Sequence, residues 1–457
     1  MRKILLLACI AVLAGGCGGS GKSSSSGGGS SSSSSDFKAE SSSARAGQTL
    51  TIYGFGPGDD IANNRAAIAT KTLAPAKVQN PAGAYNPQAF LTRLASGSPP
   101  DVIYVDRQQI ATLAAKNALE PLNGCVKGQN INLSQYRKAA LDEASYKGQL
   151  YALPEFTNQR TLIVNLDAVK QAGLNLSDVS TTDWNKLKTV AKKLTVIKGG
   201  KLERIGFDPK IPEFFILWAH ANGAQLLSAD GKRAHLNSPQ AVQALAYTKS
   251  LIDEQGGWSK FKTFGDTWDF FGKDNQVAKN QVGAWPMESW YWNVLAQNSP
   301  NVHVAAVPFT DKQGRPFTFF TGSGWAVPKG AKHPALACTW MKTMTSTPTW
   351  MTAARKRAAS AKASGYPFTG LYTANAVADR QILNQVYKPT SPQYDNAVKL
   401  LVQVQNNAVF WPASPAGTQI QQALTDAINR VLAGSQAPKQ ALDRAQTEAQ
   451  NAIDSST

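Results

Sequence analysis

Residues 98–106 read Ser-Pro-Pro-Asp-Val-Ile-Tyr-Val-Asp, a short apolar run that follows a proline pair and ends at an acidic residue. Val102 to Val105 has the length and β-branched composition of a buried strand. An amphipathic helix is predicted directly before it, over residues 87–96. This pattern is typical of an open α/β sheet, in which ligands collect at the carboxyl ends of the strands. Asp106 stands at such an end, so we predict it either as a ligand-binding residue or as the N-cap of the next helical segment.

The chain after Gln48 continues this alternation of strands and helices. Strands are predicted at 49–53, 161–165, 302–307 and 318–327, with a hairpin at 146–154. Helices are predicted at 61–73, 184–194, 214–221, 239–255, 334–345, 379–386, 394–409, 420–432 and 438–453. There is no repeat period and no long linker between these elements. The pattern therefore predicts an α/β fold of two lobes with several crossovers.

The first 47 residues have the features of an export signal followed by a tether. Met1-Arg2-Lys3 is basic, and the uncharged run 4–14 is too short for a membrane span, which needs about 20 residues. Small residues precede Cys17, in a pattern that resembles the lipobox of bacterial lipoproteins. We predict a lipoprotein signal peptide over 1–16 and acylation of Cys17; Cys9 and an ordinary secretory signal are the alternatives. Residues 18–47 contain 14 Ser and 7 Gly, which predicts a flexible linker over 17–47.

The chain is basic, with 47 Lys and Arg against 30 Asp and Glu and a formal charge of +17. Removal of Arg2 and Lys3 with the signal peptide lowers this charge to +15. Nucleic-acid binding requires basic residues gathered on one face. Here they are dispersed, and even the cluster 355–357 is short. We predict no nucleic-acid partner and a non-specific attraction to anionic envelope polymers; a cleft biased toward anionic sugars is the alternative.

Local motifs for catalysis or metal binding are absent from the sequence. The four His residues lie at no metal-ligand spacing, and no Cys pair brackets them. There is no G-x-S-x-G nucleophile motif. We therefore predict no catalytic residues, no metal and no cofactor. A surface polysaccharide hydrolase is an alternative, because the paired carboxylates of glycosidases come from distant strands and leave no local pattern.

Aromatic residues are concentrated between residues 258 and 292, where 10 of 35 positions are Phe, Trp or Tyr. Aromatic faces pack against the apolar faces of sugar rings, while neighbouring amides and carboxylates bind the hydroxyl groups. The alternative is that these rings form the core, which is the usual place for Trp and Phe. We expect two or three of the 11 Trp residues to contact a ligand and the others to be structural.

Cleavage before Cys17 would leave Cys125 and Cys338 as the remaining thiols of the folded part. Cysteines of exported proteins can form disulfides. Their separation in sequence gives no information about their distance in space. We predict a Cys125–Cys338 disulfide, with two free thiols as the alternative.

The ordered segments of the chain after the linker resemble the bacterial extracellular solute-binding proteins of sugar ABC transporters, the family that includes maltose-binding protein. Each segment is degenerate alone, but their order and spacing are specific. The segments are 97–106, 148–154, 162–173, 182–195, 221–231, 237–245, 282–290, 322–337 and 431–442.

The resemblance implies a type II-like periplasmic-binding-protein fold, with two lobes, hinge crossovers and a ligand cleft between the lobes. By the family pattern, lobe 1 takes residues 48–154 and 319–372, and lobe 2 takes 155–318 and 373–457. The chain departs from that pattern at Trp285, where Met is usual, and at Glu288, near a common Gly. The ligand-binding residues implied by the resemblance are Phe55, Asp106, Glu155, Phe214, Trp218, Glu288, Trp290, Trp325 and Trp411.

The function implied is that of a monomeric, lipid-anchored binding protein outside the bacterial cell membrane. It would capture a sugar or oligosaccharide and deliver it to the permease subunits of an ABC importer, without being an enzyme. A non-sugar solute, such as an organic anion or a peptide, is the alternative ligand. Polyamines are disfavoured because a cationic ligand requires clustered carboxylates and the chain is poor in acidic residues.

Overall fold

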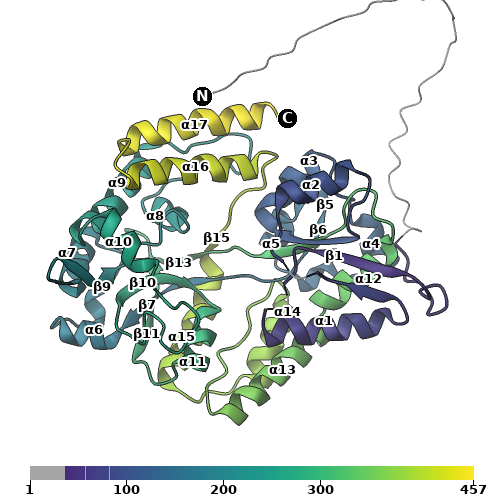
Figure 1. Ribbon diagram of the computed structural model, residues 1–457, viewed down its shortest axis with the longest axis horizontal. Helices are drawn as coiled ribbons and strands as arrows, with labels where there is room; N and C mark the ends of the chain where they lie inside the picture. Colours follow the sequence, from purple (N-terminus) through teal and green to yellow (C-terminus); the bar gives the residue numbers. More distant parts are fainter. Residues whose placement is uncertain (1–36, 57, 82, 457) are drawn as a thin grey trace, which may run out of the picture. The chain divides into compact units, whose positions relative to one another are not determined.

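The computed structural model describes residues 37–56, 58–81 and 83–456. The predicted signal peptide, Cys17 and most of the predicted linker lie outside these residues. The described residues form a mixed α/β fold, which confirms the predicted fold class (Figure 1).

The first sheet has five strands in the described residues, in the order β2-β1-β3-β14-β6. β1, β2 and β3 are parallel, because α1 (Asp60–Leu73) and α2 (Pro87–Ala95) provide the crossovers between them. β14 comes from the second half of the chain and is antiparallel to β3, with Ser323 opposite Asp106. The bounds of the strands are β2 Lys77–Gln79, β1 Thr49–Tyr53, β3 Val102–Asp106, β14 Ser323–Ala326 and β6 Ala152–Pro154.

The second sheet also has five strands in the part of the chain that is described, in the order β11-β7-β10-β9-β8. Their bounds are β11 Val304–Val307, β7 Arg160–Asn165, β10 Val282–Glu288, β9 Lys201–Phe207 and β8 Val196–Lys198. β7 is antiparallel to both of its neighbours, and each of its residues is buried. This burial on both faces explains why Leu162, Ile163 and Val164 follow one another without alternating with polar residues.

Short segments of chain pass between the two sheets and pair with one another. Residues 155–159 connect β6 to β7, and 320–322 connect β13 (Pro316–Phe319) to β14. Asn158 forms a bridge with Thr321, and Phe156 forms one with Thr373. β13 also belongs to a small sheet with β12 (Phe309–Thr310) and β15 (Ala408–Val409).

The predicted strand at 318–327 is wrong in one respect, because it is two strands separated by Gly322. Gly322 has a φ of +157°, and a Cβ there would collide with the carbonyl oxygen of Phe156 and the guanidinium of Arg107. The chain changes partners at this glycine, from the small sheet to the first sheet. Periodicity alone cannot detect such a break, since both halves are apolar.

Helices cover both sheets. Most of the predicted helix ranges agree with the observed bounds within a few residues, but the predicted helix 394–409 is too long, because α15 ends at Val404 and Ala408–Val409 form the strand β15. Asp183 caps α7 by accepting from the N–H groups of Asn185 and Lys186. α16 and α17, at the end of the chain, lie side by side (Figure 1). The other helices are α3 Ile110–Ala115, α4 Asn123–Gly128, α5 Lys138–Glu143, α6 Leu166–Gln171, α7 Trp184–Leu194, α8 Phe215–Ala221, α9 Pro239–Glu254, α10 Trp258–Gly265, α11 Tyr291–Asn298, α12 Pro334–Thr345, α13 Thr347–Ser364, α14 Ala376–Gln381, α15 Pro392–Val404, α16 Gly417–Leu432 and α17 Pro438–Asp454.

The buried apolar residues form one core around each sheet. We call these the first-sheet core, which contains Ile52, Val105 and Trp325, and the second-sheet core, which contains Val164 and Trp285. Ile61 of α1, Trp350 of α13 and Ala378 of α14 form a further cluster. α14 therefore packs against α13, which in turn packs against α1. The predicted assignment of residues 373–457 to lobe 2 stays a prediction.

Cys125 of α4 and Cys338 of α12 form a disulfide, with their Cα atoms 5.6 Å apart. Both side chains are fully buried in the first-sheet core. In the described ranges, no helix combines the length and the apolar character needed to cross a bilayer. The same ranges contain no group of three or more His, Cys, Asp or Glu side chains suited to a metal ion.

Candidate ligand-binding site

Asp106 lies at the carboxyl end of β3, where the sequence places it, and its side chain is exposed. It precedes a 3-10 turn over Arg107–Gln109, but its carboxylate makes no capping hydrogen bond to that turn. Instead, the hydroxyl of Ser323 donates to Asp106 Oδ1 over 3.0 Å. The alternative role of Asp106 as a helix N-cap is therefore wrong.

Glu288 and Trp290 lie at the end of β10 in the second sheet. Arg160 Nη2 donates to Glu288 Oε1 over 2.6 Å, and Trp290 Nε1 donates to Glu288 Oε2 over 2.5 Å. Arg160 Nη2 also donates to the hydroxyl of Thr321 over 2.9 Å. Burial lowers the pKa of Arg160, and the Glu288 carboxylate opposes this by favouring the charged guanidinium. Each of the two Glu288 oxygens therefore has a partner that fixes its direction.

An aromatic pair stands beside this carboxylate. The rings of Phe271 and Trp290 are stacked, with centroids 5.8 Å apart and an interplanar angle of 18°. Phe271 is 62% exposed, and Trp290 is half-buried. The exposed part of this pair presents apolar surface beside the Glu288 carboxylate.

The end of the crossover 320–322 and the first residue of β14 lie between the two strand ends. Thr321 contacts Arg160 and Glu288, whereas Ser323, two residues later, contacts Asp106. We call this row of side chains the strand-end site; its members are Asp106, Ser323, Thr321, Arg160, Glu288, Trp290 and Phe271. Three predicted ligand contacts, Asp106, Glu288 and Trp290, are therefore gathered around one segment.

Four predicted aromatic contacts are packed inside the cores. Phe214, Trp218 and Trp325 are fully buried, and Phe55 is 3% exposed. Phe55 contacts Trp325 with a centroid distance of 4.8 Å, and Trp218 Nε1 donates to the Pro209 carbonyl over 2.9 Å. In this conformation these side chains offer no surface to a ligand, and their role as ligand contacts stays a prediction.

Glu155 is also fully buried, at the start of the crossover that follows β6. Its Oε1 accepts from Arg65 Nη2 over 2.5 Å, and neither side chain has exposed surface. Burial raises the pKa of Glu155, while the Arg65 guanidinium lowers it. The position of the carboxylate is thus explained by an internal ion pair rather than by a ligand.

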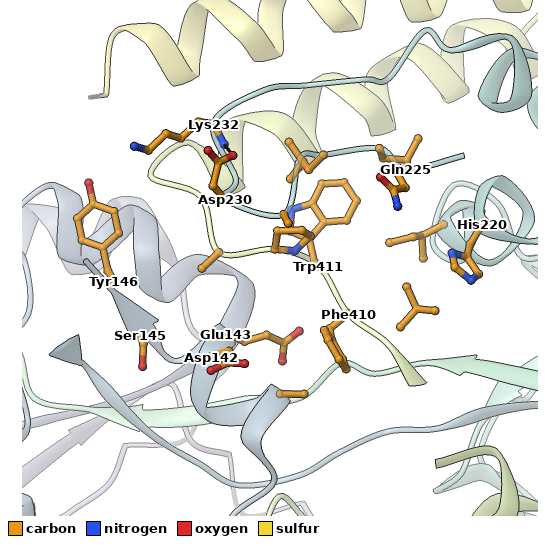
Figure 2. Close-up of a pocket in the computed structure, with 18 of the residues that line it drawn as sticks. Asp142, Glu143, Ser145, Tyr146, His220, Gln225, Asp230, Lys232, Phe410 and Trp411 are labelled. Atoms are coloured by element: carbon orange, nitrogen blue, oxygen red, sulfur yellow. Dashed lines mark hydrogen bonds between the residues drawn. The ribbon is translucent and has the colours of Figure 1, made fainter. Parts of the chain in front are cut away.

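Trp411 lies elsewhere, in the wall of a cavity of about 890 Å³ (Figure 2). The cavity is bounded by residues 139–147, 216–232 and 408–415. Among the predicted ligand contacts that the structure describes, Trp411 is the one that lines it. Asp106, Glu288 and Trp290 belong to the strand-end site, and the other five predicted residues are buried.

Sequence reasoning missed Arg160, Thr321, Ser323 and Phe271. Arg160 and Glu288 are 128 positions apart, and Asp106 and Ser323 are 217 positions apart. No local pattern reports such pairs. Phe271 belonged to the aromatic segment that the sequence singled out, and only its exposure distinguishes it from its buried neighbours.

The family model of the bacterial extracellular solute-binding proteins matches residues 76–349. The chain belongs to this family. The match includes β3, β7, β10 and β14, which are the strands that carry most of the strand-end site. The family consists of binding proteins rather than enzymes.

The chain is similar to several sugar-binding proteins at low sequence identity. It is 22% identical over 316 residues to the arabinooligosaccharide-binding protein of Bacillus subtilis, a match that covers 65% of this chain and 70% of the relative. A solved ABC substrate-binding protein of Listeria monocytogenes in complex with cycloalternan has a TM-score of 0.73 at 19% identity, covering 89% of this chain and 99% of that one. A maltose/maltodextrin-binding domain of Bdellovibrio bacteriovorus with maltotriose has a TM-score of 0.68 at 20% identity, covering 89% and 100%. These structures confirm the two-lobed fold.

Proposed function

We propose that this extracellular solute-binding protein captures a sugar or oligosaccharide at the strand-end site and delivers it to an ABC importer. The observation that carries the proposal is the partly exposed Trp290–Phe271 pair beside Glu288. An aromatic face next to an oriented carboxylate suits a sugar ring, which is apolar on its faces and has hydroxyls at its edge. The named relatives support the same ligand class, because they bind arabinooligosaccharides, cycloalternan and maltotriose.

The proposed site draws on both sheets. Asp106 and Ser323 belong to the first sheet, whereas Glu288 extends from the second. A sugar that binds both groups at once favours the arrangement in which they are closest. Its differential affinity for that arrangement would drive the hinge closure expected of a two-lobed binding protein.

A thermal-shift screen of mono-, di- and trisaccharides tests the ligand class. A ligand that binds the folded state at about 100 Kd stabilises it by about 2.7 kcal/mol, which raises the melting temperature measurably. We expect at least one oligosaccharide to do so. If amino acids, peptides or organic anions raise the melting temperature while no sugar does, the carbohydrate assignment fails.

Substitution of Trp290 tests the location of the site. We expect Trp290→Ala to weaken binding of the sugar found in the screen by about tenfold or more, since about 1.4 kcal/mol of lost stacking corresponds to that factor. Trp258→Ala is the matched control, because Trp258 lies in the same aromatic segment, packs on Phe261 and is not a member of the strand-end site. Titration calorimetry measures the affinities, and circular dichroism checks that both variants are folded. Equal affinities in the two variants would contradict the proposed site.

The hydrolase alternative predicts turnover. Mass spectrometry of oligosaccharides after incubation with the pure protein should detect no cleavage product. If the protein cleaves an oligosaccharide and the cleavage depends on Asp106 or Glu288, the proposed binding function is wrong and the protein is an enzyme.

We also propose that the mature protein is anchored through a lipid on Cys17. The support is the sequence before Cys17 and the Ser/Gly tether after it. We expect Cys17→Ser to abolish incorporation of a radiolabelled fatty acid and to release the protein from the membrane fraction. Continued labelling of the variant would show that a residue other than Cys17 carries the lipid.

A further inference from the structure

The first described residues of the chain are fixed to the first-sheet core. Phe37 is fully buried in that core. Gln129, which follows α4, donates through Nε2 to the carbonyl oxygens of Phe37 and of Ala335 in α12, both over 3.0 Å. A few residues later, Arg45 Nη1 donates to the Thr72 carbonyl in α1 over 2.6 Å. The chain therefore enters the folded body at Phe37, next to α4 and α12.

Gln129 is itself held from several sides, so the position of Phe37 is well defined. Its backbone N–H donates to the carbonyl of Cys125 over 3.0 Å. Its Oε1 accepts from the hydroxyl of Thr339 over 3.1 Å, and its backbone carbonyl accepts from Lys342 Nζ over 2.7 Å. The disulfide between Cys125 and α12 holds the two helices together at the same place.

The surface around this entry point is basic. Lys38 directly follows Phe37, Lys127 lies in α4, and Lys332 lies two residues before α12; all three are exposed. Lys342 of α12 is half-buried and contacts Gln129, as described above. We call these four lysines the entry face, because they surround the residue at which the chain enters the body.

Acidic residues are scarce in the same region. Residues 121–141 and 312–378, which include α4 and α12, hold no Asp or Glu. Asp101 reaches the start of α12, where its carboxylate accepts from the N–H of His333, but it is only 3% exposed. Glu40 is half-buried and accepts from a glutamine amide. The positive charge of the entry face is therefore only weakly offset.

The lipid proposed on Cys17 would bring the entry face close to a bilayer, and this step rests on that proposal. Only 20 positions separate Cys17 from Phe37. As the flexible coil that the sequence predicts, this stretch has a root-mean-square reach of about 25 Å. An anionic bilayer surface attracts Lys side chains that come within about one Debye length, roughly 8 Å at physiological salt. The face from which the tether starts meets the bilayer more often than any other face.

We propose that the entry face binds the anionic headgroups of the membrane in which the lipid is inserted. The four ammonium groups contact phosphate and other anionic groups at the bilayer surface. The body then lies with α4 and α12 toward the bilayer. The attraction is electrostatic, so it requires anionic lipid and is weakened by salt.

Vesicle sedimentation tests the surface in the absence of the lipid anchor. The probe is the lipid-free chain of residues 18–457, which contains every described residue, mixed with vesicles of equal parts phosphatidylglycerol and phosphatidylcholine. We expect binding at low salt and release at about 0.5 M salt, because the attraction is screened. Vesicles of phosphatidylcholine alone should not bind the chain. Equal binding to both kinds of vesicle would overturn the proposal.

Two triple variants locate the contact. The entry-face variant reverses the three exposed charges and leaves Lys342 in place, because Lys342 also holds Gln129. The control variant makes the same change in net charge at three exposed lysines in the part of the chain around the second sheet. We expect the first to weaken vesicle binding at least tenfold and the second at most threefold. The variants are Lys38→Glu/Lys127→Glu/Lys332→Glu and Lys260→Glu/Lys273→Glu/Lys279→Glu.

Circular dichroism checks that both variants are folded. If they lose vesicle binding equally, the dispersed charge of the chain is responsible and the inference is wrong. Soluble polyglutamate tests a polymer as the partner. If the unmodified chain binds polyglutamate more tightly than it binds the vesicles, the entry face recognises an anionic polymer and the proposed membrane contact is wrong.

The lipidated protein in vesicles tests the orientation. Acetylation of lysines, followed by mass spectrometry, measures how accessible each side chain is. In vesicles that contain phosphatidylglycerol, we expect Lys127 and Lys332 to react at least threefold more slowly than in phosphatidylcholine vesicles, whereas Lys260 should react at the same rate in both. Equal rates for Lys127 and Lys332 in the two kinds of vesicle would refute the orientation.

Sugar affinity separates this inference from the proposed sugar-binding function. The entry-face variant should keep the sugar affinity of the unmodified protein, because none of its three substituted residues belongs to the strand-end site. Loss of vesicle binding with sugar affinity kept supports the inference. If no sugar binds the unmodified protein, the proposed function fails, while the vesicle measurements still decide whether the entry face binds the membrane.

Discussion

Arg65 is held by three kinds of contact inside the protein. Its Nη2 donates to Glu155 over 2.5 Å, its Nη1 donates to the Met344 carbonyl over 3.2 Å, and its guanidinium lies 3.9 Å from the centre of the Trp350 ring. Because both members of the ion pair are fully buried, each compensates for the desolvation of the other. The pair thus connects α1 to the crossover that begins at Glu155.

Arg65→Met should destabilise the protein by about 3–5 kcal/mol, since it leaves the Glu155 carboxylate buried and unpaired. Urea denaturation measures the loss. The double variant Arg65→Met/Glu155→Gln removes both charges and should be less destabilised than the single variant. Lys138→Met, which breaks an exposed pair with Asp142, is the control and should have little effect. A double variant that is less stable than the single one would contradict this account.

Asp379 gives a prediction for the dependence of stability on pH. Burial raises its pKa to about 6, although Arg137, 2.7 Å away, and Thr373 lower it. Between pH about 4 and about 6, the folded protein therefore binds more protons at this group than the unfolded chain does. The stabilising contribution of Asp379 is complete below pH about 4 and is lost as the pH rises through about 6.

Asp379→Asn should remove this contribution. The free energy of unfolding of the unmodified protein, relative to that of Asp379→Asn, should fall by about 2–3 kcal/mol between pH about 4 and pH about 7. Urea denaturation at several pH values measures it. Asp253→Asn, which breaks an exposed pair with Lys249, is the control. A relative stability of Asp379→Asn that is constant over this range would show that the pKa of Asp379 is not raised.

At the scale of elements, the fold is closed by contacts between distant parts of the chain. β14 completes the sheet that begins with β1, and the disulfide joins α4 to α12 across 213 positions of sequence. Both connections link the first third of the chain to the segment after residue 322. A cross-link over so long a loop restricts the unfolded chain strongly in the chain-entropy description.

The double variant Cys125→Ala/Cys338→Ala should therefore lose about 2–5 kcal/mol of unfolding free energy. Reduction of the unmodified protein with dithiothreitol should lower its stability by a similar amount. The reductant should have no effect on the double variant, which serves as its control. If the oxidised and reduced proteins have equal free energies of unfolding, the disulfide does not contribute to stability and the packing of α4 and α12 is sufficient to hold them.

At the scale of the whole molecule, two cores are connected by crossover segments that also carry part of the strand-end site. Thr321 and Ser323 lie in or beside such a crossover, and Asp106 and Glu288 extend from the two sheets that it joins. A ligand that contacts these groups is coupled to the relative arrangement of the sheets. The formal charge of +17 is dispersed along the chain and explains none of this geometry.

Binding of the sugar should therefore decrease the radius of gyration measured by small-angle X-ray scattering. The reason is that a ligand bound to both sheets favours their closer arrangement. Trp290→Ala should show no decrease at the same sugar concentration. An unchanged radius of gyration on saturation of the unmodified protein would contradict hinge closure, even if the sugar binds.

Local sequence was enough to predict the type and order of many elements, because apolar periodicity, capping residues and prolines act within a few positions of one another, but it did not predict α13, β9 or β10. It also located the aromatic segment and placed Asp106 at the end of a strand. Tertiary structure decided which side chains are accessible. Trp218, Trp325 and Glu155 are fully buried, whereas Trp290 and Phe271 border the strand-end site. Periodicity reports that one face of an element is apolar, but what packs against that face, and therefore which ring stays exposed, depends on residues hundreds of positions away.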